Sequence, residues 1–242
     1  MKIVVYTALF GKRDKLWSVF PLALGGCEHV CFSDRPRQQI GLWSVDRKLL
    51  VGSESIPALP SWDVRIVPAL KRSARLTARY YKTLSHKHFP EADITIWVDA
   101  NVRLLVTPQV AVKKWLGDAL LAAFKHPDRK CLYQEASSCA RMQGKGNKKV
   151  LKCQASAYLK EGMPRRWGLA ETKCVIRRHS SEVNALNEAW WAEISTYSIR
   201  DQISLPYVCW KAGLRWRTIP GRASWHPVRG QSSADFWFIH HI

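Results

Sequence analysis

A carboxylate and a carboxamide end a strongly apolar segment in the middle of the chain. In the stretch IWVDANV, the mostly apolar residues 94–98 stop at Asp99, and Asn101 follows two positions later. Side chains two positions apart point to the same side of an extended chain. Oxygen ligands of this kind suit Mg²⁺ or Mn²⁺, which also bridge to substrate phosphates. The pattern favours a metal and diphosphate site, and the alternative is an Asx turn, in which either side chain bonds its own backbone.

Strands and helices alternate around this segment over the first 130 residues. Such alternation is typical of an α/β fold with a mainly parallel central sheet. The segments expected to form strands are 3–11, 28–32, 43–45, 64–67, 94–98 and 170–178. The segments expected to form helices are 73–88, 110–120, 131–161 with an exposed break at 144–147, 181–194, and 199–211 with an interruption at Pro206.

No linker rich in Pro, Gly or Ser divides the chain, so we expect one domain over residues 1–242. Residues 1–105 are expected to form its nucleotide- and metal-binding half, and residues 106–242 its acceptor half. Ligands of open parallel sheets bind beyond the carboxyl ends of the strands. Three polar residues are predicted to lie at those ends: Thr7, Asp34 and Asp99.

The charge is the strongest signal in the composition. The 38 Lys and Arg outnumber the 19 Asp and Glu, which leaves a formal net charge of +19. A field of this size favours polyanionic partners such as nucleic acid, anionic lipid headgroups or phosphorylated glycans. The alternative is a basic surface that serves solubility alone.

Other features of the sequence narrow the class of protein. There is no run of eighteen apolar residues, so no transmembrane helix is expected. The seven cysteines are odd in number and scattered, which favours free thiols in a reducing cytoplasm over a disulfide framework. Neither a G-x-S-x-G elbow, a phosphate-binding P-loop nor an H-E-x-x-H helix is present. Readings as a serine hydrolase, a P-loop enzyme or a zinc protease therefore lack a motif.

Six pieces of the chain carry a family resemblance. In order they are VVYTALFGKRDKL (4–16), CFSD (31–34), RYYKTLSHKHFPEADITIWVDANV (79–102), KHPDRKCLYQEA (125–136), EGMPRRWGLAETKCVIRRHS (161–180) and WWAEISTYSIRDQIS (190–204). With these pieces the chain resembles a glycosyltransferase-like family first catalogued as a domain of unknown function, the TOD1/MUCI70-type domain. That family is related to the family-eight, glycogenin-like transferases. The resemblance implies a single-domain A-type (GT-A, Rossmann-like) fold that binds a nucleotide-diphospho-sugar.

The resemblance also implies roles on the donor side of the site. Thr7 and Asp34 match positions that hold the nucleotide base and ribose. Arg79 and Lys82 precede the metal strand and are expected to neutralise the donor diphosphate; exposed cations on a helix surface are the alternative. Two further residues, His126 and Arg129, are expected to face the donor or the acceptor, with a structural role for the histidine left open.

A metal site is implied at Asp99 and Asn101, with Mn²⁺ or Mg²⁺ as the cofactor. Many relatives in the wider clan have Asp at the position of Asn101, so weaker metal binding or a contact through water is expected here. In family-eight relatives a histidine near the C-terminus supplies a third ligand. This chain offers His226 in SWHPVRG, with His240 as the alternative.

The catalytic residues implied by the resemblance are Asp201, Gln202 and Glu171. The pair Asp201-Gln202 matches an element that lies beside the anomeric carbon of the donor, and Glu171 is a candidate on the acceptor side. The alternative for Asp201 is a negative charge that complements the dipole at a helix start. The implied reaction is metal-dependent transfer, with retention of anomeric configuration, from a UDP-sugar or another nucleoside diphosphate sugar. A metal and nearby cations would neutralise the leaving group.

Basic clusters alternate with tryptophans in the second half of the chain, at positions such as Arg166, Trp167, Arg215 and Trp216. Cations for phosphates together with aromatic rings for stacking are a nucleic-acid-binding pattern. This predicts DNA binding and DNA modification, with sugar transferred to hydroxymethylated bases in a bacterial or phage-infected cytoplasm. One alternative is transfer to a lipopolysaccharide or capsule precursor at a membrane surface. Another is a non-catalytic nucleic-acid-binding protein on a transferase scaffold.

Overall fold

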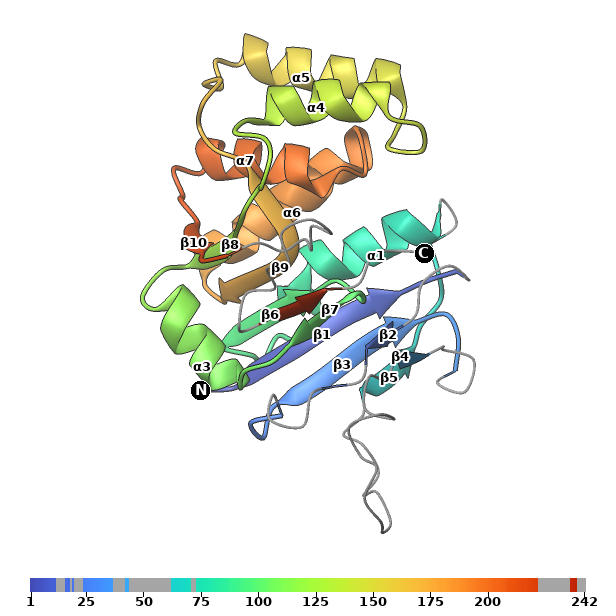
Figure 1. Ribbon diagram of the computed structural model, residues 1–242, viewed down its shortest axis with the longest axis vertical. Coiled ribbons are helices and arrows are strands. Elements are labelled where there is room, and N and C mark those ends of the chain that lie inside the picture. The colour runs from blue at the N-terminus through green and yellow to red at the C-terminus, as the bar shows by residue number, and fades with distance from the viewer. Residues whose placement is uncertain are drawn as a thin grey trace.

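A seven-stranded sheet with the order β10-β8-β9-β6-β1-β3-β5 forms the centre of the fold in the computed structural model (Figure 1). The structure describes residues 1–11, 16–17, 19, 24–36, 42–43, 62–70, 73–221 and 236–238. The strands of the sheet are β1 (Ile3–Leu9), β3 (Glu28–Ser33), β5 (Asp63–Ile66), β6 (Ile94–Val98), β8 (Leu121–Lys125), β9 (Ala170–Arg178) and β10 (Arg217–Ile219). Two small sheets pair β2 (Leu16–Trp17) with β4 (Leu42–Trp43) and β7 (Val102–Leu104) with β11 (Phe236–Phe238).

The sheet is mainly parallel. Strand β1 runs parallel to both β3 and β6, β3 to β5, and β8 to β10. Only β9 is reversed, and it pairs in antiparallel fashion with β6 on one side and β8 on the other. The prediction of an α/β fold with a mainly parallel central sheet is therefore confirmed. Because β9 is reversed, its first residues lie at the edge where the neighbouring strands end.

Helices cover both faces of the sheet in layers (Figure 1). The alternating side chains of β1 show the two faces: Val4, Tyr6 and Ala8 enter one core cluster, while Val5 and Leu9 enter the other. The first face is covered by α1 (Ala74–Thr83), α6 (Ser181–Thr196) and α7 (Asp201–Lys211), with α4 (Leu132–Arg141) and α5 (Lys148–Lys160) packed beyond α7. The second face is covered by α3 (Pro108–Ala111) and the π-helical turn η3 (Val112–Leu116).

Most predicted helices are present, with differences at their ends. The long segment 131–161 is divided into α4 and α5, as expected, and the Asn147 side chain caps α5 by accepting from the N–H groups of Lys149 and Val150. The segment 73–88 is two helices, because the backbone leaves the helical region at Leu84 before α2 (Ser85–His88). Both boundaries depend on local capping, which hydrophobic periodicity does not report.

The predicted interruption at Pro206 was wrong, because α7 runs unbroken through this residue. A proline lacks the N–H that would bond the carbonyl four residues earlier, which here is Gln202 in the first turn of the helix. Residues 203–209 of α7 are all buried, so tertiary packing holds the helix together where local preference opposes it.

Two further observations concern the environment of the chain. Among the described residues, no helix is both long enough and apolar enough to cross a membrane. All seven cysteines are free thiols, and five of them are buried.

Candidate active site

The predicted site residues converge on one edge of the sheet. Asp34 directly follows β3, Asp99 follows β6 and His126 follows β8, so each lies where a parallel strand ends. Glu171 joins them at the same edge because it is the second residue of the reversed strand β9, opposite Phe124 in β8. This is the edge at which open α/β sheets bind their ligands.

Thr7 was expected at a strand end, and that expectation was wrong. Strand β1 continues two residues further, to Leu9, because the apolar segment goes on past the threonine. The Thr7 side chain is completely buried, and its hydroxyl has no hydrogen-bond partner within the described residues. Its role in donor binding stays a prediction.

Asp99 and Asn101 lie in a tight turn, so the assumption of an extended chain between them was wrong. The N–H of Val102 donates to the carbonyl oxygen of Asp99 at 2.8 Å, which reverses the chain between β6 and β7. The Asp99 carboxylate is fixed by the indole of Trp97, whose Nε1–H donates to Oδ1 at 2.7 Å. Asn101 is largely buried within this turn.

The centre of the site is a buried ion pair between Lys82 and Asp201. Lys82 lies in the last turn of α1 and Asp201 in the first turn of α7, and Lys82 Nζ is 2.5 Å from Asp201 Oδ2. The same ammonium lies 3.4 Å from Oδ1 of Asp99. Lys82 thus connects the strand-end motif to the predicted catalytic pair across 119 positions of sequence.

Two more groups complete the surroundings of the Asp201 carboxylate. The hydroxyl of Thr172 donates to Oδ2 at 2.7 Å, and Nε of Arg79 lies 3.5 Å from Oδ1. Burial of Asp201 opposes its ionisation, but the charges of Arg79 and Lys82 outweigh burial and hold the pKa of this carboxyl well below its ordinary value. A buried ion pair persists only when its remaining lone pairs and protons are satisfied, and Asp201 meets that condition.

Thr172 reaches Asp201 because β9 is irregular at this point. Along β8, Ala123 pairs with Val175, but the next residue, Phe124, pairs with Glu171. The three residues between them on β9 are extra relative to β8, so the pairing of the two strands is locally interrupted at Thr172. Thr172 was not predicted from the sequence, because the spacing of apolar residues in this segment does not indicate a β-bulge.

A second charged cluster centres on Glu135, a residue that sequence reasoning also missed. Its carboxylate, on the first turn of α4, is almost fully buried and accepts from Arg129 Nε and, at 2.9 Å, from Arg200 Nη2. Burial alone would raise the pKa of Glu135, but a hydrogen bond from Cys139 and the charge of Arg200 outweigh burial. The pKa of Glu135 therefore lies below its ordinary value. Arg200 also donates to Oε1 of Gln202 at 3.0 Å, which ties this cluster to the predicted catalytic pair.

His126 lies beside this cluster in a mainly structural setting. Its Nδ1 accepts from the backbone N–H groups of Asp128 and Arg129, at 3.2 and 3.1 Å. Burial lowers the pKa of His126 below its ordinary value. The neutral ring shapes the loop after β8, and a role of His126 toward a ligand stays a prediction.

The remaining predicted residues lie nearby with polar partners of their own. Asp34 accepts from the N–H of Gly11 at 3.3 and 3.2 Å and lies 3.7 Å from Nε of Arg35. Glu171 is nearly buried, and its Oε1 is 3.4 Å from Nζ of Lys173.

A metal ion was predicted at Asp99, Asn101 and a C-terminal histidine. Both His226 and His240 lie outside the described residues. Within the described part of the chain, no group of three or more His, Cys, Asp or Glu is arranged to hold a metal ion. The carboxylate of Asp99 accepts from Lys82 and Trp97 through Oδ1. Carboxylate and amide oxygens such as those of Asp99 and Asn101 fit the ligand preference of Mg²⁺ and Mn²⁺.

One solved structure resembles this fold over most of the chain. It is the apo structure of the bifunctional glycosyltransferase WbbM, with a TM-score of 0.49 and 12% sequence identity. The likeness covers 90% of this chain and 38% of that one. A likeness of this extent assigns no role to any residue.

Two proteins of Arabidopsis thaliana are similar in sequence, each at 25% identity over 85% of this chain. One is named alkaline ceramidase TOD1 and the other probable hexosyltransferase MUCI70. The chain spans 48% of the first and 37% of the second, less than half of either protein. Their names describe two different reactions, acting on different bonds.

The family itself is identified by a match that covers residues 1–218 and is described as TOD1/MUCI70, glycosyltransferase-like domain. This confirms the resemblance inferred from the six sequence pieces. Since the matched range is most of the 242 residues, the chain belongs to the TOD1/MUCI70 glycosyltransferase-like domain family.

Proposed function

We propose that this protein is a metal-dependent glycosyltransferase that moves a sugar from a nucleoside diphosphate sugar, first of all a UDP-sugar, to a hydroxyl acceptor. The observation that supports it best is the position of Lys82, 2.5 Å from Asp201 and 3.4 Å from Asp99. This arrangement joins the two family motifs at the edge of the sheet where a donor would bind. The family resemblance further favours retention of anomeric configuration.

The chemistry needs a leaving diphosphate to be neutralised more than it needs a strong nucleophile. Arg79, whose side chain is 24% exposed, is the cation that can meet the diphosphate directly. Lys82 is buried and contributes a fixed charge behind Asp99. A bound Mn²⁺ or Mg²⁺, held by Asp99 and Asn101, would supply Lewis-acid charge to the same phosphates.

Asp201 and Gln202 then act beside the sugar. Since the pKa of Asp201 lies well below its ordinary value, this residue stays ionised at neutral pH and can stabilise positive charge that develops on the sugar ring. Gln202 is oriented by Arg200, and its amide remains a hydrogen-bonding group for the donor. Glu171 is the candidate group on the acceptor side.

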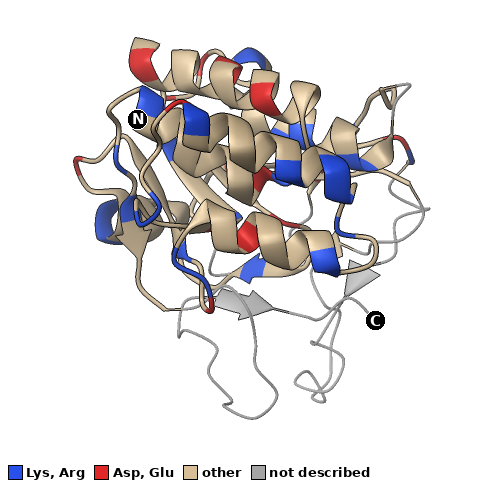
Figure 2. Ribbon diagram, turned by 90° about the horizontal axis from the view of Figure 1, so that it is seen from above, with Lys and Arg blue, Asp and Glu red and all other residues tan. Residues whose placement is uncertain are grey.

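For the acceptor we propose a hydroxymethylated base in DNA, modified in the cytoplasm. The formal charge of +19 supports a polyanionic acceptor. Figure 2 shows that Lys and Arg are spread over several helices and loops of the described chain. The free state of all seven cysteines agrees with a reducing compartment.

Donor hydrolysis is the most direct test of the transferase proposal. A panel of nucleotide sugars is incubated with the protein and Mn²⁺, and release of the nucleoside diphosphate is measured. We expect turnover of at least one donor, its loss on chelation, and a decrease of at least 100-fold in Asp99→Ala. Asp63→Ala, which removes an exposed carboxylate on β5, is the matched control and should retain turnover.

The same preparations separate this proposal from its alternatives. Because one relative is named an alkaline ceramidase, fatty-acid release from ceramide is measured in parallel. Ceramide cleavage that depends on Asp99, without turnover of any nucleotide sugar, would contradict the transferase proposal. Radiolabelled sugar that appears in a lipid extract, and not in hydroxymethylated DNA, would replace the DNA acceptor by a membrane one. Tight DNA binding without turnover of any nucleotide sugar would support the alternative of a non-catalytic nucleic-acid-binding protein.

A further inference from the structure

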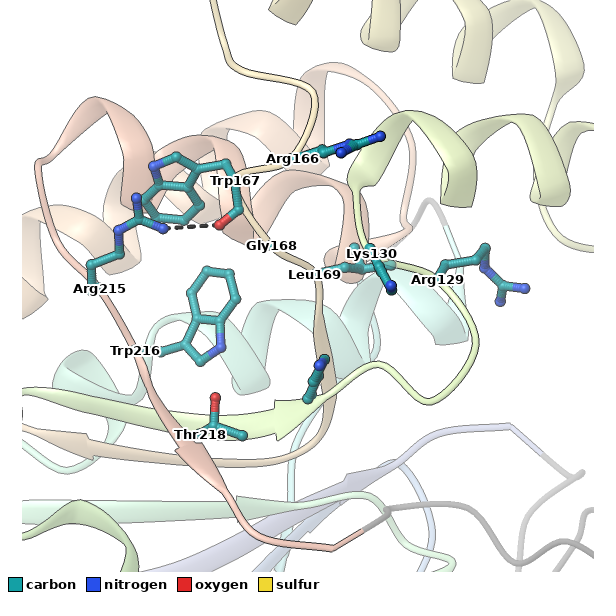
Figure 3. Close-up of a pocket in the computed structure, with 10 residues that line it drawn as sticks. Arg129, Lys130, Arg166, Trp167, Gly168, Leu169, Arg215, Trp216 and Thr218 are labelled. Carbon is teal, nitrogen blue, oxygen red and sulfur yellow. Dashed lines mark hydrogen bonds between the residues drawn. The ribbon is translucent and has the colours of Figure 1, made fainter.

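A basic pocket of about 380 Å³ lies beside the candidate active site (Figure 3). It is formed by the end of β8 and the loop that follows, the segment before β9, and the segment from the end of α7 into β10. Its volume is in the range of sites that hold one small ligand or one unit of a larger one. The residues that line it are Lys125, Arg129, Lys130, Arg166, Trp167, Gly168, Leu169, Arg215, Trp216 and Thr218.

Five of these ten side chains are cationic, and none of the described lining residues is acidic. Lys125, Lys130 and Arg166 are exposed and form no ion pair with any described residue. Arg129, by contrast, is held by Glu135. Cations gathered around a pocket without carboxylates repel one another, so an anionic ligand would relieve that repulsion.

Two tryptophans form the opposite side of the pocket in fixed orientations. The guanidinium of Arg215 lies over the ring of Trp167 at 4.0 Å and donates to the Trp167 carbonyl oxygen at 2.9 Å. The rings of Trp167 and Trp216 meet edge to face, with centroids 5.3 Å apart. Gly168 contacts the Trp216 ring so closely that a Cβ there would lie 3.3 Å from it. Figure 3 shows the Trp216 ring turned toward the space between these segments.

The pocket adjoins the candidate active site through shared residues. Arg129 lines the pocket and binds Glu135, and Glu135 also binds Arg200, the residue directly before Asp201. Leu169, another lining residue, lies two positions before Glu171. A ligand in the pocket would therefore lie next to the side of the site assigned to the acceptor.

We propose that this pocket binds a phosphorylated ring of the acceptor, with the phosphate against Lys125, Lys130 and Arg166 and the ring against Trp216. Guanidinium and ammonium groups bind phosphate through charge-assisted hydrogen bonds. An indole offers a large apolar face to a base or a sugar ring. Identification of the bound ring as the acceptor rests on the proposed function, whereas the binding of a phosphorylated ring to this pocket does not.

Binding without any donor tests this inference. Isothermal titration calorimetry at low salt compares two phosphorylated rings, thymidine 5′-monophosphate and glucose 6-phosphate, with thymidine and glucose. We expect at least one phosphorylated ligand to bind at least tenfold more tightly than its uncharged counterpart. Arg166→Gln and Trp216→Leu should each weaken that binding by about tenfold, whereas Lys160→Gln, on the exposed end of α5, should leave it unchanged. Thermal melts confirm that each variant is folded.

The outcomes are distinct. Preference for thymidine 5′-monophosphate identifies a nucleotide as the occupant, and preference for glucose 6-phosphate identifies a phosphorylated glycan. Equal binding of charged and uncharged ligands, or binding that is insensitive to both Arg166→Gln and Trp216→Leu, would overturn the inference. The binding measurement contains no nucleotide sugar. A failure to turn over nucleotide sugars in the separate activity assay would therefore contradict the proposed function without affecting the binding result.

Discussion

Nη2 of Arg177 donates a 2.6 Å hydrogen bond to the carbonyl oxygen of Lys82, from the last residue but one of β9 to the last turn of α1. Nη1 donates to the carbonyl oxygen of Thr83 at 2.9 Å and to the side chain of Asn187 at 2.8 Å. The guanidinium is completely buried, and burial lowers the pKa of Arg177 from its ordinary value. A cation is favoured there because the last carbonyls of a helix carry partial negative charge. Arg177 thus fixes the helix end from which the Lys82 side chain reaches Asp201.

Replacing Arg177 by Met should destabilise the fold and displace Lys82. The Thr83 carbonyl and the Asn187 side chain each lose a buried donor, at roughly 1–3 kcal/mol for each acceptor left unpaired, whereas the Lys82 carbonyl keeps the Tyr6 hydroxyl. Urea unfolding measures the loss. Arg141→Met is the matched control, because Arg141 is exposed at the end of α4, and its change should stay within about 0.5 kcal/mol. Equal losses in the two variants would contradict a special role for Arg177.

Replacing Asp201 by Asn should affect stability and turnover together. The variant leaves the buried Lys82 ammonium without its closest carboxylate, which typically costs about 3–5 kcal/mol. Donor turnover should fall by at least 100-fold, beyond any loss due to unfolding, and circular dichroism identifies the folded fraction. Asp63→Asn, which removes a charge from an exposed ion pair, should change neither quantity by a comparable amount. Full turnover in folded Asp201→Asn would exclude this residue from the chemistry.

Stability should fall between pH 6.5 and pH 4 because of two partly buried histidines. Burial lowers the pKa of both His88 and His179 from 6.5 to about 4. Both are therefore neutral in the folded protein in this window, while the unfolded chain takes up protons, so the free energy of unfolding decreases as the pH falls. Thermal melts at half-unit steps measure the trend, with the interval from pH 7 to pH 8 as an internal reference. His179→Gln should make the dependence shallower, and an unchanged slope would contradict the assignment to His179.

Replacing Gly168 by Ala should disturb both the backbone and the pocket. Gly168 has a φ of +125°, and a Cβ there would lie 3.3 Å from the Trp216 ring. We expect a loss of about 1–3 kcal/mol from backbone strain, together with weaker binding of the phosphorylated ring. Gly213→Ala is the matched control, since its φ is also positive, at +66°, but nothing lies within 4 Å of the added Cβ. Weakened binding in both variants would show that the Trp216 contact is not the cause.

The sequence predicted local elements better than it predicted their arrangement. Apolar runs located β1, β3, β6 and β9, because a strand buried on both faces leaves a continuous apolar signature. The reversal of β9 could not be inferred, since strand direction depends on pairing partners distant in the chain. The π-helical turn at Val112–Leu116 was likewise read as ordinary helix, because its apolar spacing fits one.

The site was predicted to a similar extent. Motif resemblance identified Arg79, Lys82, Asp99 and Asp201, and the fold brings these four together. Glu135 was missed, because its importance depends partly on Arg200, which lies 65 positions away in the chain. A physical signal did exist, since an acidic residue in the first turn of a predicted helix, six positions after Arg129, could have been tested as its partner.

The reversed strand β9 has a consequence for how this family can diversify. The segment 161–169 approaches β9 from the site edge and supplies Arg166, Trp167, Gly168 and Leu169 to the pocket rim. Insertions or replacements in this segment would alter the rim while β9 kept its pairing with β6 and β8. Changes confined to this segment would therefore alter the ligand preference of the pocket while the catalytic centre stayed the same.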